Sequence, residues 1–174
     1  MKFGIEGPFE LTRSHRGLID SSAVGRREYW EWVEEYAPGL SNACGCYIFG
    51  IKASRGSLPW YVGKAERQSF RKECLTSHKI VHFNNVIVGR RGRPEIYFLP
   101  QLTNTGRYRS PTSTRRPAIR ELESLLIGMA INRNPSLSNI AGTKWVQQLA
   151  VDGFINSSKK RSGPSKELRK LFGE

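Results

Sequence analysis

Apolar residues recur at helical spacing near the start of the chain. Trp30, Val33 and Tyr36 would share one face of a helix over roughly 23–36. A pair of serines directly before this stretch suits the N-cap, and a Pro-Gly pair follows it as a stop signal. We therefore predict that the N-terminal extension, residues 1–40, contains one helix that packs on the core.

Three apolar stretches predict the strands of a small sheet. Residues 44–51 have the composition of a buried strand, and residues 59–63 form a second apolar run that starts with proline. The polar residues 52–58 between them predict a turn, so the two strands are close enough to pair as a hairpin. Residues 94–99 predict a third strand, which a second proline closes.

Two further helices are predicted beyond the hairpin. The first covers residues 69–78, whereas residues 79–88 are compatible with either a helix or a strand. The second begins at Pro117, which suits a first helical turn, and ends near Asn132. Its expected apolar stripe consists of Ile119, Leu122, Leu126 and Met129.

These elements predict an α/β (α+β) fold with a small three-stranded, mainly antiparallel sheet flanked by helices. A chain of 174 residues is long enough to bury a core. We expect the domain to cover residues 41–142. It would follow the extension 1–40 and precede a basic C-terminal segment, 143–174, with one short helix.

The charge balance indicates a polyanionic partner. The net charge is +13 and the isoelectric point is about 10.1, which favours nucleic acid or an acidic surface. No apolar run is long enough to span a membrane, and no signal segment opens the chain. Three cysteines provide no disulfide framework. We therefore expect a cytoplasmic protein with DNA as partner, without a membrane role; RNA and a homodimer are both left open.

A long polar loop, residues 101–116, lies inside an arginine-rich stretch. Between Arg90 and Arg120 there are eight arginines, opposed only by Glu95. Phosphate contacts from such residues would supply most of the affinity for nucleic acid. The predicted nucleic-acid contacts are Arg90, Arg91, Arg93, Arg107, Arg109, Arg115 and Arg116.

Two tyrosines lie at matching places on the predicted hairpin strands. They are Tyr47, in Gly45-Cys46-Tyr47, and Tyr61, in Tyr61-Val62-Gly63. A basic helix follows, and a carboxylate appears later on an apolar helix. Cleavage of a phosphodiester requires a deprotonated water, a clamp for the anionic phosphorus centre and help for the leaving oxygen. Phenols, an arginine and a metal-binding carboxylate are chemically sufficient for this reaction.

The two triplets resemble the motifs of the GIY-YIG endonucleases. Gly45-Cys46-Tyr47 corresponds to the first triplet, with Cys46 in place of the usual isoleucine, and Tyr61-Val62-Gly63 corresponds to the second. The second triplet continues into Lys64 and an alanine, a common continuation in that family. The resemblance covers roughly residues 43–142.

Three later positions extend this resemblance. Arg71 lies ten residues after Tyr61, where the family has its arginine. Glu123 precedes a Leu-Ile pair, as the family's metal-binding glutamate does, and Asn139 lies near the place of its asparagine.

The resemblance implies a role for each matched residue. Tyr47 would act as general base or position the attacking water, and Tyr61 would orient the water or contact the phosphate. Arg71 would hold the scissile phosphate, whose geometry suits a guanidinium. Glu123 would bind one Mg²⁺ or Mn²⁺ ion, which needs few protein ligands. Lys64 would add positive charge beside them.

The remaining family positions are less well matched. Asn139 would hold the local structure or the phosphate, although Asn132 and Asn134 compete for this role. The family often has a histidine or tyrosine one turn after its arginine, where this chain has Leu75. His78 would return to the same face of a continuous helix and could substitute for it.

Three alternatives accompany this interpretation. One is a basic protein that sits on ribosomal RNA, which would explain the charge but not the paired triplets. Zinc is another, weaker one: Cys44 and Cys46 with His78 and His82 supply suitable ligand types. The third is a nucleic-acid-binding module that has the same fold but no catalytic turnover. The sequence names no DNA target, because no helix-turn-helix or zinc finger accompanies the motifs.

Overall fold

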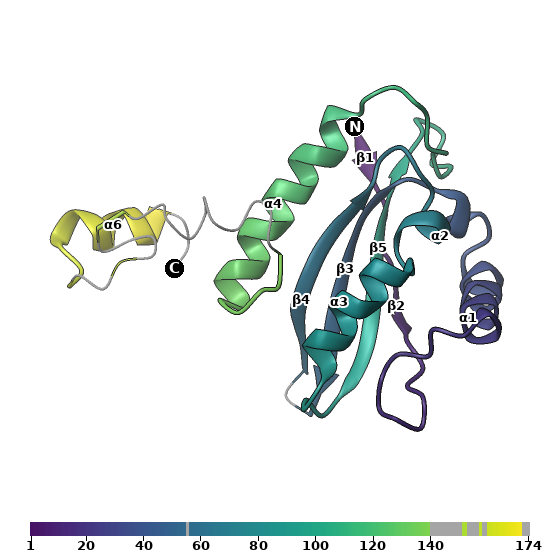
Figure 1. The fold of residues 1–174 in the computed structure, drawn as a ribbon. Helices are drawn as coiled ribbons and strands as arrows, with labels where there is room; N and C mark the ends of the chain where they lie inside the picture. Colours follow the sequence, from purple (N-terminus) through teal and green to yellow (C-terminus); the bar gives the residue numbers. More distant parts are fainter. Residues whose placement is uncertain (55, 140–150, 153–156, 158–159, 172–174) are drawn as a thin grey trace. The chain divides into compact units, whose positions relative to one another are not determined.

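An antiparallel, curled sheet of five strands forms the centre of the protein in the computed structural model (Figure 1). The structure describes residues 1–54, 56–139, 151–152, 157 and 160–171. The strand order is β1-β5-β3-β4, and β2 also pairs with β5. The strands are β1 (Lys2–Phe3), β2 (Glu6–Glu10), β3 (Gly45–Ala53), β4 (Gly56–Ala65) and β5 (Arg93–Leu102).

The predicted α+β class is confirmed, but the prediction of three strands was wrong. The two additional strands come from the N-terminal segment and lie along β5, where Lys2 pairs with Leu102 and Phe9 pairs with Ile96. They are short, and a glycine and a proline interrupt their pattern. Their extended conformation depends on hydrogen bonds to β5, which local sequence does not reveal.

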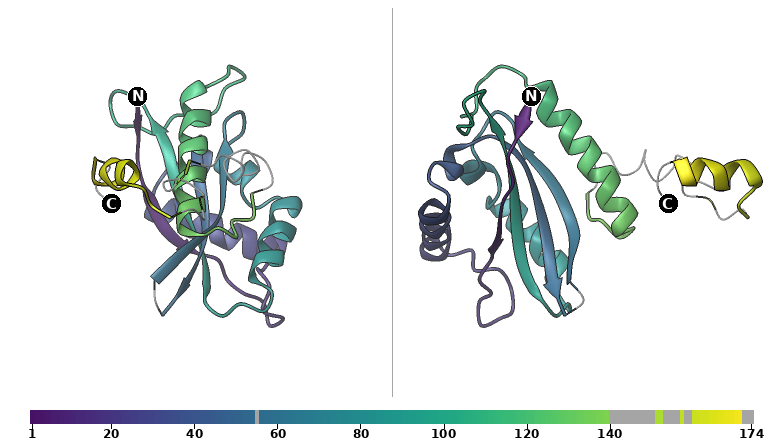
Figure 2. Two further views of the ribbon diagram at one scale, coloured as in Figure 1. Left: turned by 90° about the vertical axis from the view of Figure 1, so that its left-hand side faces the viewer. Right: turned by 180° about the vertical axis from the view of Figure 1, so that it is seen from behind.

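Helices α1 to α4 lie on both faces of the sheet (Figure 2). Ser22 caps α1 as predicted, because its hydroxyl accepts from Gly25 N at 2.9 Å. The predicted helix over 69–78 is wrong: it is broken, and Thr76 caps a second helix that runs through the ambiguous residues up to Ile87. The elements are α1 (Ala23–Tyr36), the 3₁₀ turn η1 (Leu40–Asn42), α2 (Phe70–Glu73), α3 (Ser77–Ile87), α4 (Pro117–Arg133) and α6 (Gly163–Leu171).

Alternate residues of β3 pack into two separate hydrophobic clusters, one on each face of the sheet. Tyr47 and Phe49 face α2 and α3, and the Phe49 ring stacks on Phe83 with a centroid distance of 4.2 Å. Cys46 faces the opposite side, where it packs against Ile119 of α4. The views in Figure 2 agree that α4 lies on one face of the sheet, with α1 to α3 on the other. We refer to these as the α3 face and the α4 face.

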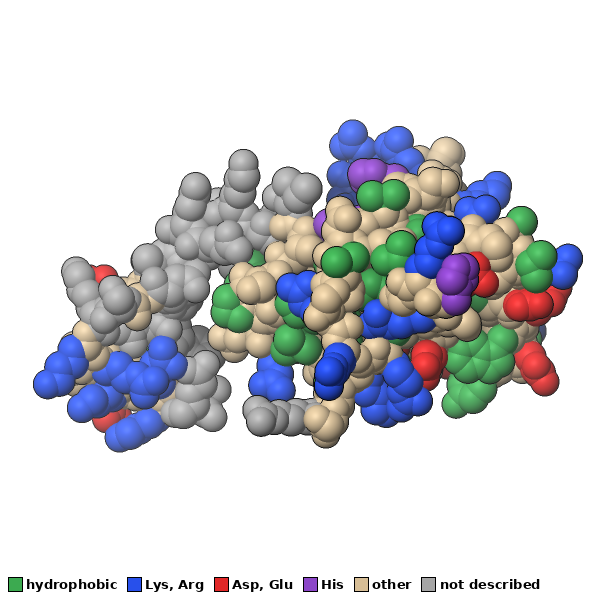
Figure 3. All heavy atoms as spheres, turned by 60° about the horizontal axis from the view of Figure 1, so that its bottom comes forward, with side chains coloured by type: hydrophobic (Ala, Val, Ile, Leu, Met, Phe, Trp, Pro, Cys, Tyr) green, Lys and Arg blue, Asp and Glu red, His purple; other side chains and the backbone are tan. Residues whose placement is uncertain are grey.

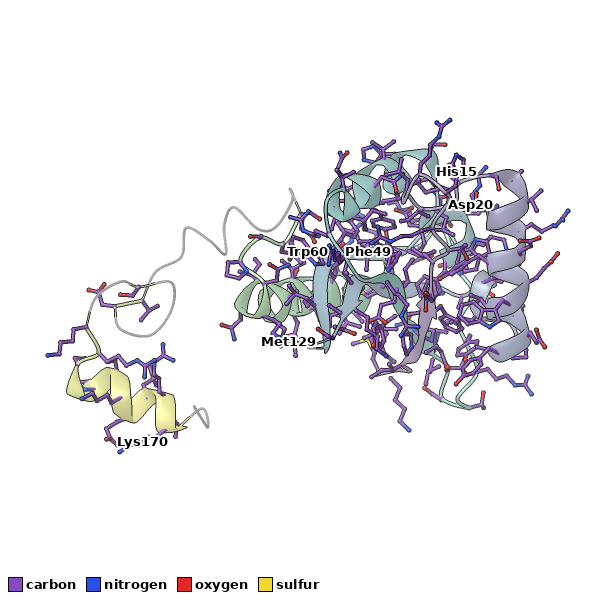
Figure 4. All side chains as sticks on the ribbon, turned by 90° about the horizontal axis from the view of Figure 1, so that it is seen from below. His15, Asp20, Phe49, Trp60, Met129 and Lys170 are labelled. Carbon is purple, nitrogen blue, oxygen red and sulfur yellow. The ribbon has the colours of Figure 1, made fainter. Side chains whose placement is uncertain are left out.

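Helix α4 follows the sequence prediction except at its outer residues. Pro117 occupies its first turn and Ile119 is buried. Leu122 and Leu126 pack partly against the cluster around Cys44. Met129 does not belong to the buried stripe, because 63% of it is exposed. Figure 4 labels this side chain on α4.

Residues after α4 hydrogen-bond along the outer edge of β4. The Asn134 side chain donates to Pro59 O at 2.7 Å, and Ser138 N donates to Trp60 O at 2.9 Å. Side-chain and backbone groups thus satisfy the outer edge of β4, beyond which no further strand is described. We call residues 134–139 the edge segment.

The chain separates into two compact units, Met1–Asn139 and Ile140–Glu174. The larger unit contains the whole sheet. In the smaller one, helix α6 has basic residues in its last turn; residues 143–150 of the predicted basic segment lie outside the described residues. No helix in the described part of the chain is both long and apolar enough to cross a membrane.

Candidate functional site

The two hairpin tyrosines lie side by side on the α3 face. Tyr47 on β3 pairs with Gly63, and Tyr61 lies two residues earlier on β4, so both side chains leave the same face of the sheet. Their ring centroids are 6.0 Å apart. The structure therefore brings together the two phenols that the sequence singled out.

Close contact with Tyr47 explains the glycine of the second triplet. A Cβ at Gly63 would lie 2.4 Å from Cζ of Tyr47 and 2.5 Å from its hydroxyl. Only a residue without a side chain allows the phenol to lie flat across β4 at this point. The glycine of the first triplet has a similar basis, because a Cβ at Gly45 would lie 2.1 Å from Leu99 O.

Tyr47 is completely buried. Its hydroxyl lies beside that of Tyr61, yet it makes no hydrogen bond of ordinary geometry with any described residue. Burial raises the pKa of this phenol well above its usual value of 10.0, and the charges of Cys74, Tyr61 and Glu73 raise it further. A neutral, buried phenol is a poor general base at neutral pH.

Tyr61 is the more accessible phenol, and a lysine side chain contacts it. Lys79 Nζ donates to the Tyr61 hydroxyl at 2.5 Å and lies 4.7 Å from the centroid of its ring. Glu73 lies 3.8 Å from the same ammonium group. Lys79 was not predicted as a site residue. A helical interpretation of residues 79–88 would have placed it and His82 on one face of α3.

His82, rather than His78, is the histidine next to the tyrosines. Its ring packs edge-on against Tyr61, with a centroid distance of 4.9 Å, and its Nε2 lies 3.0 Å from Ser138 Oγ. Burial lowers the pKa of His82, and the charges of Lys79 and His78 lower it further. The expectation for His78 assumed a continuous helix after Arg71. The break before Thr76 removes that relationship, and the His78 side chain is exposed.

The carboxylate and the remaining lysine form a pair on the α4 face. Glu123 Oε2 accepts from Lys64 Nζ, and the pair is partly buried. Cys46 lies beneath it and donates to Ile119 O at 3.2 Å. Burial raises the pKa of the Cys46 thiol to about 12; the charge of Glu123 raises this pKa while that of Lys64 lowers it.

Glu123 retains one oxygen for a cation. Its Oε1 makes no hydrogen bond with the described residues, whereas its Oε2 is occupied by Lys64. No cluster of three or more metal-ligating side chains exists among the residues that the structure describes. The residues present thus fit an ion that keeps most of its water ligands, as Mg²⁺ does, and do not form a protein cage.

Arg71 lies apart from both pairs. Its guanidinium is 6.0 Å from the centroid of the Trp30 ring on α1. It lines a cleft of about 360 Å³ together with Arg26 and Arg27. Arg71 makes no ion pair or hydrogen bond with the described part of the chain, although its charge lowers the pKa of Glu34. Arg27 pairs with Glu31 at 3.7 Å, so Arg71 and Arg26 are the arginines best placed to attract an anion in this arginine cleft. Arg26 and Arg27 were not predicted as site residues, although the RR pair on an amphipathic helix was visible in the sequence.

Asn139 has a structural position next to the second triplet. Its Oδ1 accepts from Val62 N at 2.8 Å and its Nδ2 donates to Val62 O at 2.6 Å. The side chain thereby continues the β4 ladder between the tyrosine and the glycine of the triplet. Asn134 holds Pro59 similarly, whereas Asn132 is exposed.

Some arginines of residues 90–116 have intramolecular partners for their guanidinium groups, and others have none among the described residues. Arg90 stacks over Trp60 at 4.2 Å, and Arg93 pairs with Glu10 at 3.1 Å. Arg109 donates to Leu102 O, and Arg116 donates to Gln101 and Ser110. The exposed side chains without such partners among the described residues are Arg91, Arg107 and Arg115. On the face drawn in Figure 3, Lys and Arg outnumber acidic side chains.

The four potential zinc ligands do not form a group. Cys46 belongs to the α4 face, where its thiol donates to a backbone carbonyl, and His82 belongs to the α3 face. The alternation of β3 therefore separates these two ligand types. This arrangement does not favour the zinc alternative.

The predicted residues thus form two pairs on opposite faces of the sheet, with the arginine cleft beside α1. Tyr47 and Tyr61 occupy the α3 face, and Lys64 and Glu123 occupy the α4 face. Both pairs include a residue of β4, so the outer strand is the element common to them. In the comparisons with known proteins, no family model, curated protein or solved structure matches the chain.

Proposed function

We propose that this protein is a Mg²⁺- or Mn²⁺-dependent endonuclease that hydrolyses phosphodiester bonds in DNA. The observation that carries the proposal is the packing of Tyr47 and Tyr61, with ring centroids 6.0 Å apart, beside the ammonium group of Lys79. The buried Tyr47 hydroxyl has no hydrogen-bond partner among the described residues, and burying an unpaired hydroxyl is unfavourable for core packing. The resemblance to the GIY-YIG endonucleases offers a function for this pair.

The tyrosines have different roles in this proposal. Tyr61 accepts a hydrogen bond from Lys79, so its own O–H can donate to a phosphate oxygen or to the attacking water. Tyr47 is buried and stays neutral, because burial raises the pKa of its phenol. We therefore assign Tyr47 to positioning Tyr61, and the water-orienting role to Tyr61.

Charge around β4 would bind the substrate and the ion. Arg71, with Arg26 and Arg27, offers guanidinium groups to the phosphate backbone. Glu123 would hold a metal ion through Oε1 on the α4 face, across the sheet from Tyr61, while Lys64 fixes the orientation of the carboxylate. A bound Mg²⁺ ion would supply Lewis-acid stabilisation of charge on the phosphate.

A plasmid-cleavage assay tests this proposal. With Mg²⁺ or Mn²⁺ the wild-type protein should nick supercoiled DNA, and EDTA should abolish the product. Glu123→Gln and Tyr61→Phe should each lower the rate by about 100-fold or more. Glu121→Gln is the matched control, because it removes an exposed carboxylate from the same helix. Equal rates for Glu123→Gln and Glu121→Gln would refute the assigned site.

One observation favours the second candidate, a nucleic-acid-binding module without turnover. Lys64 already neutralises Glu123, and the phenol and carboxylate pairs lie on opposite faces. The module would bind DNA with a steep salt dependence. Tight binding without product under either metal ion would establish this alternative, and Lys64→Ala would then leave binding only slightly weaker.

A further inference from the structure

A buried carboxylate on the α4 face has no role in the site described above. Glu95 on β5 is only 3% exposed, and its Oε1 has no hydrogen-bond partner among the described residues. It pairs in register with Gly50 on β3, where a Cβ would be in van der Waals contact with Oε1, at 3.9 Å, and closer to Leu58 O, at 3.2 Å.

Glu95 borders an apolar pocket. The pocket has a volume of about 360 Å³, a size typical of small-ligand sites. Helix α4 crosses this face obliquely, and the strands extend beyond the end of the helix (Figure 1). The walls of the pocket are mainly aliphatic and come from β3, β4, β5 and α4. They include Ile48, Leu58, Leu99 and Leu126.

No cation pairs with Glu95 among the residues that the structure describes. Arg93, two residues earlier on β5, pairs instead with Glu10 at 3.1 Å. The polar neighbours in the pocket are Ser57 and Tyr97. The pKa of Tyr97 is raised by burial, then by the charge of Glu95 and by a side-chain hydrogen bond with it. An ionised carboxylate that is buried without a cation is unfavourable, because it loses its hydration, unless a partner offsets that loss.

We propose that this pocket binds an ammonium or guanidinium group carried on an apolar stem, with Glu95 as its anionic partner. The apolar walls would take up the stem, and the carboxylate would accept hydrogen bonds from the cationic head. The net charge of +13 disfavours non-specific attraction of cations, so recognition must come from this local carboxylate. The ligand is either a free small amine or a Lys or Arg side chain of a partner peptide.

The proposal does not depend on nuclease activity, and binding tests it directly. Amide resonances of the ¹⁵N-labelled full-length protein would be followed during titration with n-butylammonium, n-butylguanidinium and neutral n-butanol. We expect saturable shifts at Gly50 and Ser57 for the two cations and affinity at least about tenfold weaker for butanol. Equal affinity for butanol, or no saturable shifts with either cation, would overturn the proposal.

Two variants and a control separate binding from folding. Glu95→Gln keeps the shape and removes the charge, so it should fold and lose at least about tenfold in cation affinity. Gly50→Ala keeps Glu95 but adds a methyl group against it, and should also weaken binding. Glu28→Gln, exposed on α1, should bind as wild type does. Wild-type affinity in both pocket variants would refute the site.

A short peptide distinguishes the two sources of the cation. The blocked tripeptide Gly-Lys-Gly presents the same ammonium group together with backbone on both sides. If it binds at least as tightly as butylammonium, the site accepts a partner's side chain. If only the free amine produces saturable shifts, the pocket is a small-molecule site.

Discussion

The ring of Tyr47 lies directly against the backbone of Gly63 on the neighbouring strand. A Cβ at position 63 would come within 2.4 Å of Cζ of the phenol, which is buried and has no space to retreat. The second triplet therefore keeps its glycine for a steric reason that is independent of catalysis.

Replacement of Gly63 by alanine should destabilise the fold. Forcing a methyl group into this contact should lower the free energy of unfolding by about 1–3 kcal/mol, measured by urea denaturation. Gly128→Ala is the matched control, because nothing lies within 4 Å of a Cβ built there on α4. It should raise stability by about 0.5–1 kcal/mol. Similar losses in both variants would contradict the steric account.

Removal of the Tyr47 hydroxyl should stabilise the protein while impairing the proposed activity. Tyr47→Phe relieves a buried hydroxyl without a partner, so the free energy of unfolding at pH 7 should increase by about 1 kcal/mol. DNA cleavage should fall in the same variant, because Tyr47 positions Tyr61. Stability is measured by urea denaturation, with exposed Tyr36→Phe as the control. A loss of stability in Tyr47→Phe would contradict this expectation.

The stability of the wild-type protein should fall in alkali, partly because of Tyr47. The pKa of this phenol is raised in the folded state. Its contribution is therefore fully present below the pKa of the unfolded chain, about 10, and is lost as the pH rises above it. Tyr29 and Cys74, whose pKa values burial also raises, should add to this loss. Between about pH 8 and pH 11, the free energy of unfolding should therefore fall less steeply with pH in Tyr47→Phe than in the wild-type protein.

Loss of the Asn139 side chain should expose the backbone amide of Val62, at the edge of β4, to hydrogen exchange with solvent. Asn139→Ala leaves the N–H and C=O of Val62 without their partners, which should cost about 2–4 kcal/mol of stability. Hydrogen exchange at the Val62 amide should accelerate strongly. Asn132→Ala, at an exposed position, should leave it unchanged. Full protection of Val62 in Asn139→Ala would show that another group holds the edge.

The arginines after β5 should separate into binding and structural residues. Arg107→Ala and Arg115→Ala remove exposed, uncommitted guanidinium groups, so each should lower DNA affinity and reduce the slope of log K against log salt by about 1. Arg116 donates to Gln101 and Ser110, so Arg116→Ala should chiefly reduce stability. Fluorescence anisotropy at several salt concentrations, with thermal denaturation, checks both. Identical slopes in Arg107→Ala and wild type would exclude that phosphate contact.

The sequence correctly predicted two helices whose starts are marked by a capping residue or a proline. Ser22 caps α1, and Pro117 begins α4, as expected from their side chains. The hairpin also followed from two apolar runs, but its turn is shorter than the predicted 52–58, because β3 continues to Ala53 and β4 begins at Gly56. By contrast, β1 and β2 depend on pairing with a strand about 85 to 100 residues away, and such long-range pairing leaves little trace in short segments.

The sequence identified several residues of the candidate site, but it did not reveal which face of the sheet each residue occupies. Strand alternation alone implied that Lys64 and Tyr61 face opposite sides of β4, a signal that the motif resemblance obscured. The roles of Lys79 and His82 depend on where α3 begins, and the Thr76 cap determines this. Hydrogen bonds from Asn139 to Val62 required knowledge of tertiary packing.

The edge segment also limits how this protein can assemble. An unprotected outer strand invites a strand from another chain, which leads to continuous sheets and aggregation. Here Asn134, Ser138 and Asn139 already hold the outward carbonyls of Pro59, Trp60 and Val62. Two copies of the chain therefore cannot join by strand addition over this part of β4. If the protein dimerises, other surfaces must make the contact, and the strand common to both residue pairs stays at the outside of the sheet.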